Sequence, residues 1–143
     1  MNISVLSHAS VLSTHAGKAL SLLRIVAGLM FMQHGAQKLF GFPAEAMGPF
    51  NLLSQMGIGG VLELVGGALI VLGLFTRPVA FILSGMMAVA YFQMHWQFGT
   101  ASPFPLVNHG ELAALYCWVF LYLVFAGPGE WAVDNQLSRR RRF

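Results

Sequence analysis

Four long apolar segments, separated by short breaks that hold proline, glycine or arginine, restrict what this chain can fold into. They cover residues 19–42, 57–76, 78–98 and 109–126. Each comes close to the roughly 20 residues that a helix needs to cross about 30 Å of hydrocarbon. Backbone groups in lipid must be satisfied internally, and the alternating pattern of a barrel is absent. The sequence therefore predicts an all-α fold, a bundle of four transmembrane helices.

The composition supports a membrane environment. Hydrophobic residues make up 57% of the 143 positions and charged residues only 9%, against about 25% charged residues in a soluble domain. A soluble fold of this size could not cover so much apolar surface. We expect a single multi-pass domain in the lipid bilayer, in a bacterial inner (cytoplasmic) membrane.

The basic residues predict the orientation. Lys18, Arg77 and the run 139–142 fall on one side of the membrane, and Lys38 at most on the other. Cytoplasmic loops carry the excess of lysine and arginine, so both termini should be cytoplasmic. The predicted parts are a short polar N-terminal tail (1–18), the four-helix membrane domain (19–137) and a basic C-terminal tail (138–143). No basic face with interleaved aromatics indicates nucleic-acid binding.

Six titratable residues from all four helices fall in the outer third of the predicted bilayer: His34, Lys38, Glu63, His95, His109 and Glu111. At about 1.5 Å per residue, Glu63 and His34 lie at nearly the same depth, about 8–9 Å below the outer surface. Each intramembrane ionisable group costs roughly 2.5–3.5 kcal/mol on insertion scales. The cluster therefore needs compensating partners or a function.

Helical spacing predicts that this cluster converges inside the bundle, because residues three and four apart share a face. Each helix carries one such stripe: Arg24, Gly28, Phe31, Gly35 and Lys38; Gly60, Glu63, Gly67 and Ile70; Ser84, Ala88, Tyr91 and His95; Glu111, Leu115, Trp118 and Tyr122. The glycines of the second stripe are typical of close helix packing.

Glu63 is the strongest site candidate, because its helix carries no other charge. It should face the interior, either as a functional carboxylate or as a structural partner of His34 or Lys38. We take Glu63 and His34 as candidate catalytic residues. Arg24 has two readings, a ligand-binding residue or a structural one bonded to Ser84 or Tyr122.

Metal binding is not favoured. No helix carries two ligands at a spacing of three or four, as inward-facing di-metal bundles do, and His109 and Glu111 point to different faces. A haem would require His34 and His95 to oppose each other. The single cysteine, Cys117, excludes an intramolecular disulfide and a vitamin K epoxide reductase-like enzyme, which needs a cysteine pair.

Several short motifs, in order, resemble the DoxX family over roughly residues 20–137. Leu23-Arg24, Gly28, His34-Gly35 and Lys38-Leu39-Phe40-Gly41 resemble its first helix. Its second helix is matched by Leu62-Glu63-Leu64-Val65-Gly66-Gly67 and by the run Leu72 to Arg77. The third and fourth are matched by Met87-Ala88-Val89-Ala90 with His95, by Gly110-Glu111-Leu112-Ala113 and by Gly127-Pro128-Gly129 with Asp134.

The resemblance implies a four-helix membrane bundle. The family takes its name from a membrane subunit of a thiosulfate:quinone oxidoreductase. Its recurring polar positions correspond to Arg24, His34, Lys38, Glu63 and Glu111. Our first hypothesis is a redox-linked subunit. A quinone head would enter the outer cavity from the bilayer and accept hydrogen bonds from His34, Lys38 or His95. Glu63 would then take up or release the accompanying proton. Arg24, Lys38, His95 and Glu111 are the candidate binding residues.

The second hypothesis is non-enzymatic: a small-solute transporter, or a membrane anchor or chaperone for a partner protein. Four short helices leave little room for alternating access, so a transporter would have to form a homodimer. The basic run 139–142 favours a partner or contact with anionic lipid. No flavin, haem or dithiol centre is visible in the sequence, so whether the chain is itself an oxidoreductase stays open.

Overall fold

The computed structural model describes residues 3–46, 48 and 51–140. Throughout these residues the regular structure is helical, which confirms the all-α prediction. In chain order the elements are α1 (Ile3–Phe40), α2 (Gln55–Leu72), α3 (Thr76–Ala90), the π-helical turn η1 (Tyr91–His95), the 3-10 turn η2 (Gln97–Gly99), α4 (Pro105–Asn108), α5 (Glu111–Ala126) and α6 (Val133–Arg140).

Three helical segments of the described chain are long and apolar enough to cross a membrane, namely Ser13–Phe40, Gln55–Leu72 and Thr76–His95. The fourth apolar helix, α5, is shorter, at 16 residues. At 1.5 Å per residue it spans about 24 Å, less than the full hydrocarbon thickness.

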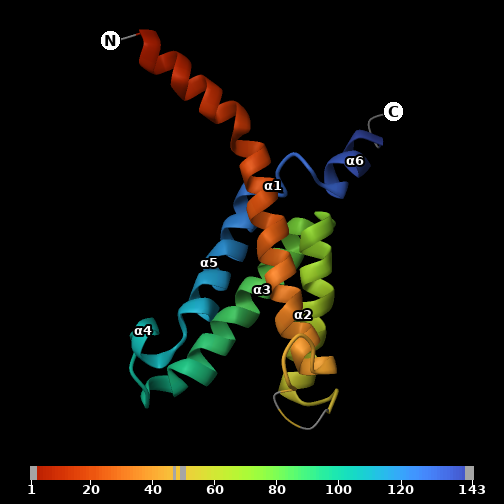
Figure 1. Ribbon diagram of the computed structural model, residues 1–143, viewed down its shortest axis with the longest axis vertical. Coiled ribbons are helices and arrows are strands. Elements are labelled where there is room, and N and C mark those ends of the chain that lie inside the picture. The colour runs from red at the N-terminus through yellow and green to blue at the C-terminus, as the bar shows by residue number, and fades with distance from the viewer. Residues whose placement is uncertain (1–2, 47, 49–50, 141–143) are drawn as a thin grey trace.

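The long helices form two antiparallel pairs. Helix α1 packs along α2, and α3 packs along α5. The two pairs lie close together at the end where α2 turns into α3, and they diverge toward the end that carries α4 (Figure 1). The bundle is therefore closed at one end and splayed at the other.

Glycines allow α1 and α2 to approach closely. A Cβ on Gly35 would lie 2.6 Å from the carbonyl oxygen of Gly60, and one on Gly28 would lie 2.9 Å from that of Gly67. Only glycine fits such backbone contact without a shift. The expected packing role of the second-helix glycines is confirmed at these positions.

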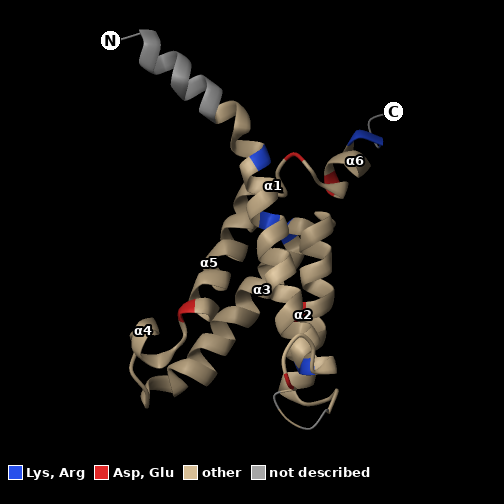
Figure 2. Ribbon diagram, viewed as in Figure 1, with Lys and Arg blue, Asp and Glu red and all other residues tan. Residues whose placement is uncertain are grey.

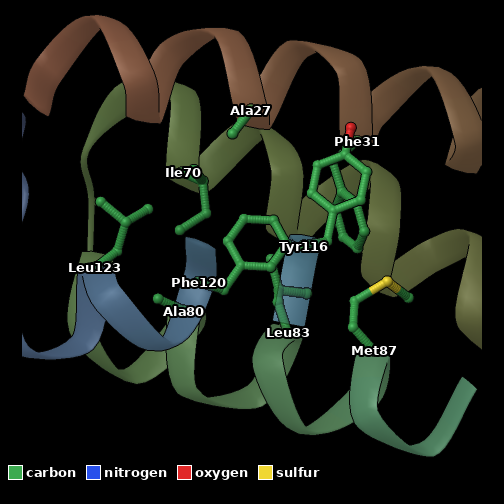
Figure 3. Packing of buried hydrophobic residues seen from close by; sticks show 9 residues of the cluster. All are labelled: Ala27, Phe31, Ile70, Ala80, Leu83, Met87, Tyr116, Phe120 and Leu123. Atoms are coloured by element: carbon green, nitrogen blue, oxygen red, sulfur yellow. The ribbon is translucent and has the colours of Figure 1, made fainter. Parts of the chain in front are cut away.

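An aromatic and aliphatic core joins the two pairs where they converge. It consists of Ala27, Phe31, Ile70, Ala80, Leu83, Met87, Tyr116, Phe120 and Leu123 (Figure 3). Phe31 of α1 is central, because its ring centroid lies 5.0 Å from that of Tyr116 and 4.9 Å from that of Phe120.

The closed end is held by polar contacts to the segment that follows α5. The buried Arg24 guanidinium donates to the carbonyl oxygens of Ile70, Val71, Pro128 and Trp131. The Asp134 carboxylate accepts from the backbone N–H groups of Phe75 (2.8 Å) and Thr76 (2.9 Å), at the start of α3. The buried Arg24 side chain therefore binds the end of α2, whose last carbonyl groups have no partner within the helix.

Three predicted boundaries differ from the structure. Residues 3–18, expected as a polar tail, continue α1, since this stretch holds no proline and its first glycine is Gly17. The second helix ends at Leu72 and not at residue 76, because Gly73 caps α2 with a φ of 66°, and the turn to α3 lies at residues 73–75. The α-helical part of the third segment ends at Ala90 and continues as the π-helical turn. In the basic tail, Arg139 and Arg140 end α6 and residues 141–143 lie outside the described part.

Candidate functional site

A pocket of about 460 Å³ lies where the two helix pairs diverge. Its polar lining residues come from α1, α2, the π-helical turn η1, the end of α4 and α5, and they are His34, Lys38, Glu63, His95, His109 and Tyr116. Apolar residues such as Phe31, Met87 and Leu112 form the rest of the wall. The volume lies in the range of about 300–1,000 Å³ that is usual for small-molecule sites.

An ion pair forms the inner wall of this pocket. The Nζ atom of Lys38 donates to Oε1 of Glu63 at 2.5 Å, linking α1 to α2. The Glu63 side chain is 4% exposed and that of Lys38 21% exposed. The second carboxylate oxygen of Glu63, Oε2, is buried and has no hydrogen-bond partner among the described residues.

Tyr116 of α5 supplies the second unpartnered group. It is 5% exposed, and its hydroxyl finds no hydrogen-bond partner within the described part of the chain. The ring reaches from α5 toward α1 (Figure 3) and lies edge-on to the ring of His34, with centroids 6.3 Å apart. Buried polar groups are nearly always hydrogen-bonded, so these two atoms mark places where a water or a ligand atom completes the pocket.

The histidines contribute further hydrogen-bonding groups. His95 sits in the π-helical turn, with its Nδ1 atom 3.1 Å from the carbonyl oxygen of Asn108. A carbonyl only accepts, so Nδ1 carries the proton, and in the neutral ring Nε2 is then an acceptor. His34 lies one turn before Lys38 on α1. His109 is exposed, with a φ of 57° just before α5.

Comparison with known proteins decides the family. A sequence model of DoxX matches residues 19–96, more than half of the chain. The chain belongs to the DoxX family. The matched DoxX region contains four of the six polar pocket residues: His34, Lys38, Glu63 and His95.

This DoxX chain is similar to three known proteins, two of which are named as membrane proteins. A Haemophilus influenzae protein is 45% identical over 123 residues, which cover 85% of this chain and 92% of that protein. A membrane protein of Mycobacterium tuberculosis is 28% identical (82% and 80% covered), and the Escherichia coli inner membrane protein YphA is 30% identical (82% and 89% covered). No solved structure matches. With its apolar helices, the chain is a multi-pass integral membrane protein.

The structure brings together four of the six candidate catalytic and binding residues, and His109 of the predicted outer cluster joins them. His34, Lys38, Glu63 and His95 all line the one pocket. The expectation that Glu63 faces the interior is confirmed by its burial. The sequence left His34 and Lys38 as alternative partners of Glu63, and in the structure its direct partner is Lys38. No group of three His, Cys, Asp or Glu residues in the described chain is close enough to hold a metal ion.

Arg24 and Glu111 lie away from this pocket. Arg24 is fully buried at the closed end, bonded to backbone carbonyls. The expected partners were wrong, because Ser84 donates instead to the carbonyl of Cys117 (2.9 Å) and Tyr122 is exposed. Glu111 is exposed in the first turn of α5.

The predicted inner face of the fourth helix was wrong. Glu111, Leu115, Trp118 and Tyr122 are all exposed, whereas the buried residues of α5 are Ala113, Tyr116, Phe120 and Leu123. Helix α5 is apolar on every side, so its hydrophobic pattern does not mark a face. Tyr116 was missed for this reason. The signal that could have found it is the small and aromatic series Ala113, Tyr116 and Phe120 at spacings of three and four.

Proposed function

We propose that this DoxX protein is the quinone-binding membrane subunit of a redox system, and that the pocket beside Lys38 and Glu63 holds the quinone ring. The observation that carries the proposal is a largely buried ion pair in a pocket whose wall is mainly apolar. Beside it lie two buried polar atoms without a hydrogen-bond partner in the described chain, Glu63 Oε2 and the Tyr116 hydroxyl. Ligand sites commonly combine apolar walls with a few placed polar groups.

The hydrogen-bonding groups suit a quinone ring. Quinone carbonyls only accept, and the pocket offers donors: the Tyr116 hydroxyl and the two Lys38 N–H groups that Glu63 does not use. Reduction to the quinol takes two electrons and two protons. In this proposal a partner redox protein supplies the electrons. Lys38 donates a hydrogen bond to the ring oxygen as negative charge develops on it. The two protons come from water and are carried to the ring one at a time by the Glu63 carboxylate.

The same proposal includes the topology. We propose that α5 completes a set of four membrane spans, that residues 19–137 form the membrane domain, and that both termini are cytoplasmic. What supports this orientation is the gathering of lysine and arginine at the end that carries both termini and α6 (Figure 2). The pocket then opens in the outer half of the bilayer. A C-terminal reporter enzyme that is active only outside the cytoplasmic membrane should give no signal, and full signal would reverse the orientation.

Quinone binding is tested on the purified protein in nanodiscs with a short-tailed quinone. The wild type should bind it, and Tyr116→Phe should weaken binding about 2- to 10-fold, the value of one hydrogen bond of about 0.5–1.5 kcal/mol. Tyr122→Phe is the matched control, because it makes the same change on the exposed face of α5. Absence of binding in the wild type would reject the redox proposal in favour of a transporter or anchor. Equal affinities of the two variants would remove Tyr116 from the site.

A further inference from the structure

A second pocket, of about 360 Å³, adjoins the first between α2 and α3. We call it the α2–α3 groove. The two pockets share six lining residues: Lys38, Met56, Glu63, Met87, Ala90 and Met94. They are therefore continuous at the Lys38–Glu63 ion pair, and a molecule bound at that pair can extend into both.

The groove leads from the ion pair toward lipid. Apart from Ser54 and Gln55 at the start of α2, the residues that line the groove beyond the shared ones are Gly59, Met86 and Val89, which carry no hydrogen-bonding side chain. Val89 and Met94 are exposed, and on a membrane-embedded helix an exposed apolar side chain faces acyl chains. Methionine side chains are flexible and adapt to irregular apolar shapes. The groove thus offers an apolar, lipid-facing channel.

The backbone keeps this channel open. Helices α2 and α3 are joined by the short turn at residues 73–75 and diverge from there (Figure 1). A Cβ on Gly59 would meet no atom within 4 Å, whereas one on the adjacent Gly60 would lie 3.1 Å from Leu39 and Lys38. Glycine inside a helix costs roughly 0.5–1 kcal/mol relative to alanine. Close packing explains the glycine at position 60. At position 59 nothing packs against the glycine, and the absence of a side chain leaves open space in the groove.

We propose that the α2–α3 groove holds the apolar tail of a long-chain quinone whose ring occupies the adjoining pocket, so that the ligand enters sideways from the bilayer. The inference rests on the proposed function and adds the ligand's class, a ring with a long prenyl-type chain. Continuity at the ion pair favours a quinone tail over an independent acyl chain, because a chain in the groove ends beside the groups that would bind the ring.

The test compares two quinones that share one ring, one without a tail and one with a tail of several isoprene units. Dissociation constants are measured in the same nanodiscs for the wild type, Gly59→Leu and Gly85→Leu. Gly85 is the matched control, since its added Cβ also meets no atom within 4 Å and it lines neither of the two pockets. We expect Gly59→Leu to weaken binding of the tailed quinone about tenfold and to leave the tailless one unchanged. Gly85→Leu should change neither.

Leucine is a better helix former than glycine, so both variants should unfold no earlier than the wild type. Val89→Trp narrows the groove from the side of α3 and must give the same selective loss. If Gly59→Leu weakens binding of both quinones equally, or leaves binding of the tailed one unchanged, the inference is overturned. The proposed function still stands in that case, provided that the wild type binds quinone. A co-purified phospholipid that only Gly59→Leu loses, with tailed-quinone binding unchanged, would assign the groove to a lipid chain and also overturn it. If the wild type binds neither quinone, the proposed function itself fails.

Discussion

Replacing Glu63 with glutamine tests whether the ion pair stabilises the packing of α1 on α2. The change removes the negative charge that lies 2.5 Å from Lys38 Nζ and leaves the ammonium group without a counter-charge. Breaking a fully buried pair costs about 3–5 kcal/mol. The Lys38 side chain keeps 21% of its exposure, so part of its charge stays solvated. We therefore expect a loss of about 2–3 kcal/mol.

Thermal unfolding in detergent, followed by circular dichroism, measures this loss. At about 3 °C per kcal/mol for a chain of this size, Glu63→Gln should lower Tm by about 6–9 °C. Glu111→Gln is the matched control: it makes the same change at an exposed position and should stay within about 0.5 kcal/mol of the wild type.

A double-mutant cycle separates the pair from its members. Lys38→Met leaves the buried Glu63 carboxyl without its partner and should also destabilise the protein. The double variant Lys38→Met/Glu63→Gln carries no charge at the pair and should be nearly as stable as the wild type. A double variant that loses the sum of the two single losses would refute the coupling. An unchanged Tm for Glu63→Gln would refute the structural role of the pair and leave Glu63 a purely functional carboxyl.

Four further variants test the helix packing and the polar contacts of the closed end, each by its Tm in detergent. Gly35→Ala places a Cβ 2.6 Å from a backbone carbonyl and should cost about 1–3 kcal/mol by overpacking, whereas Gly59→Ala meets open space and should gain up to about 1 kcal/mol. Equal Tm values for these two would contradict the close approach of α1 and α2. Arg24→Met leaves buried carbonyls unpaired at about 1–3 kcal/mol each and should lower Tm by 10 °C or more, by the order of magnitude of those losses. Asp134→Ala removes the cap of α3 and should cost about 1–2 kcal/mol. An unaffected Tm would show that the cap is replaced by solvent.

The inner faces of α1 and α2 could be predicted from the sequence because each carries residues that lipid disfavours. Arg24, Lys38 and Glu63 are costly in hydrocarbon, and the glycines between them have little surface to offer to acyl chains. On each of the two helices the charged residues and the glycines therefore mark the same face, and in the structure this face points into the bundle. The prediction succeeded where residue chemistry, not hydrophobic periodicity, carried the information.

Distant partners explain most of what could not be predicted. The turn between α2 and α3 ends where Asp134, almost sixty residues later, caps the first N–H groups of α3. The side-chain partners expected for Arg24 were wrong because backbone carbonyls have no sequence signature. The hydrophobic pattern of α5 does not distinguish its buried face, since lipid accepts aromatic residues on either side of the helix.

Arg24 and Glu63 show how the structure separates a structural charge from a site candidate when the sequence treats them alike. Both are charged residues in apolar helices, and both are buried. Arg24 uses four of its N–H groups on four carbonyl oxygens and lies remote from the pocket. Glu63 accepts from Lys38 with one oxygen, and the other has no hydrogen-bond partner among the residues that the structure describes. Because an unsatisfied buried acceptor costs about 1–3 kcal/mol, that free oxygen opposes folding unless a water or a ligand atom occupies the pocket. Spare hydrogen-bonding capacity, rather than charge, therefore makes Glu63 the residue around which a binding site can be built.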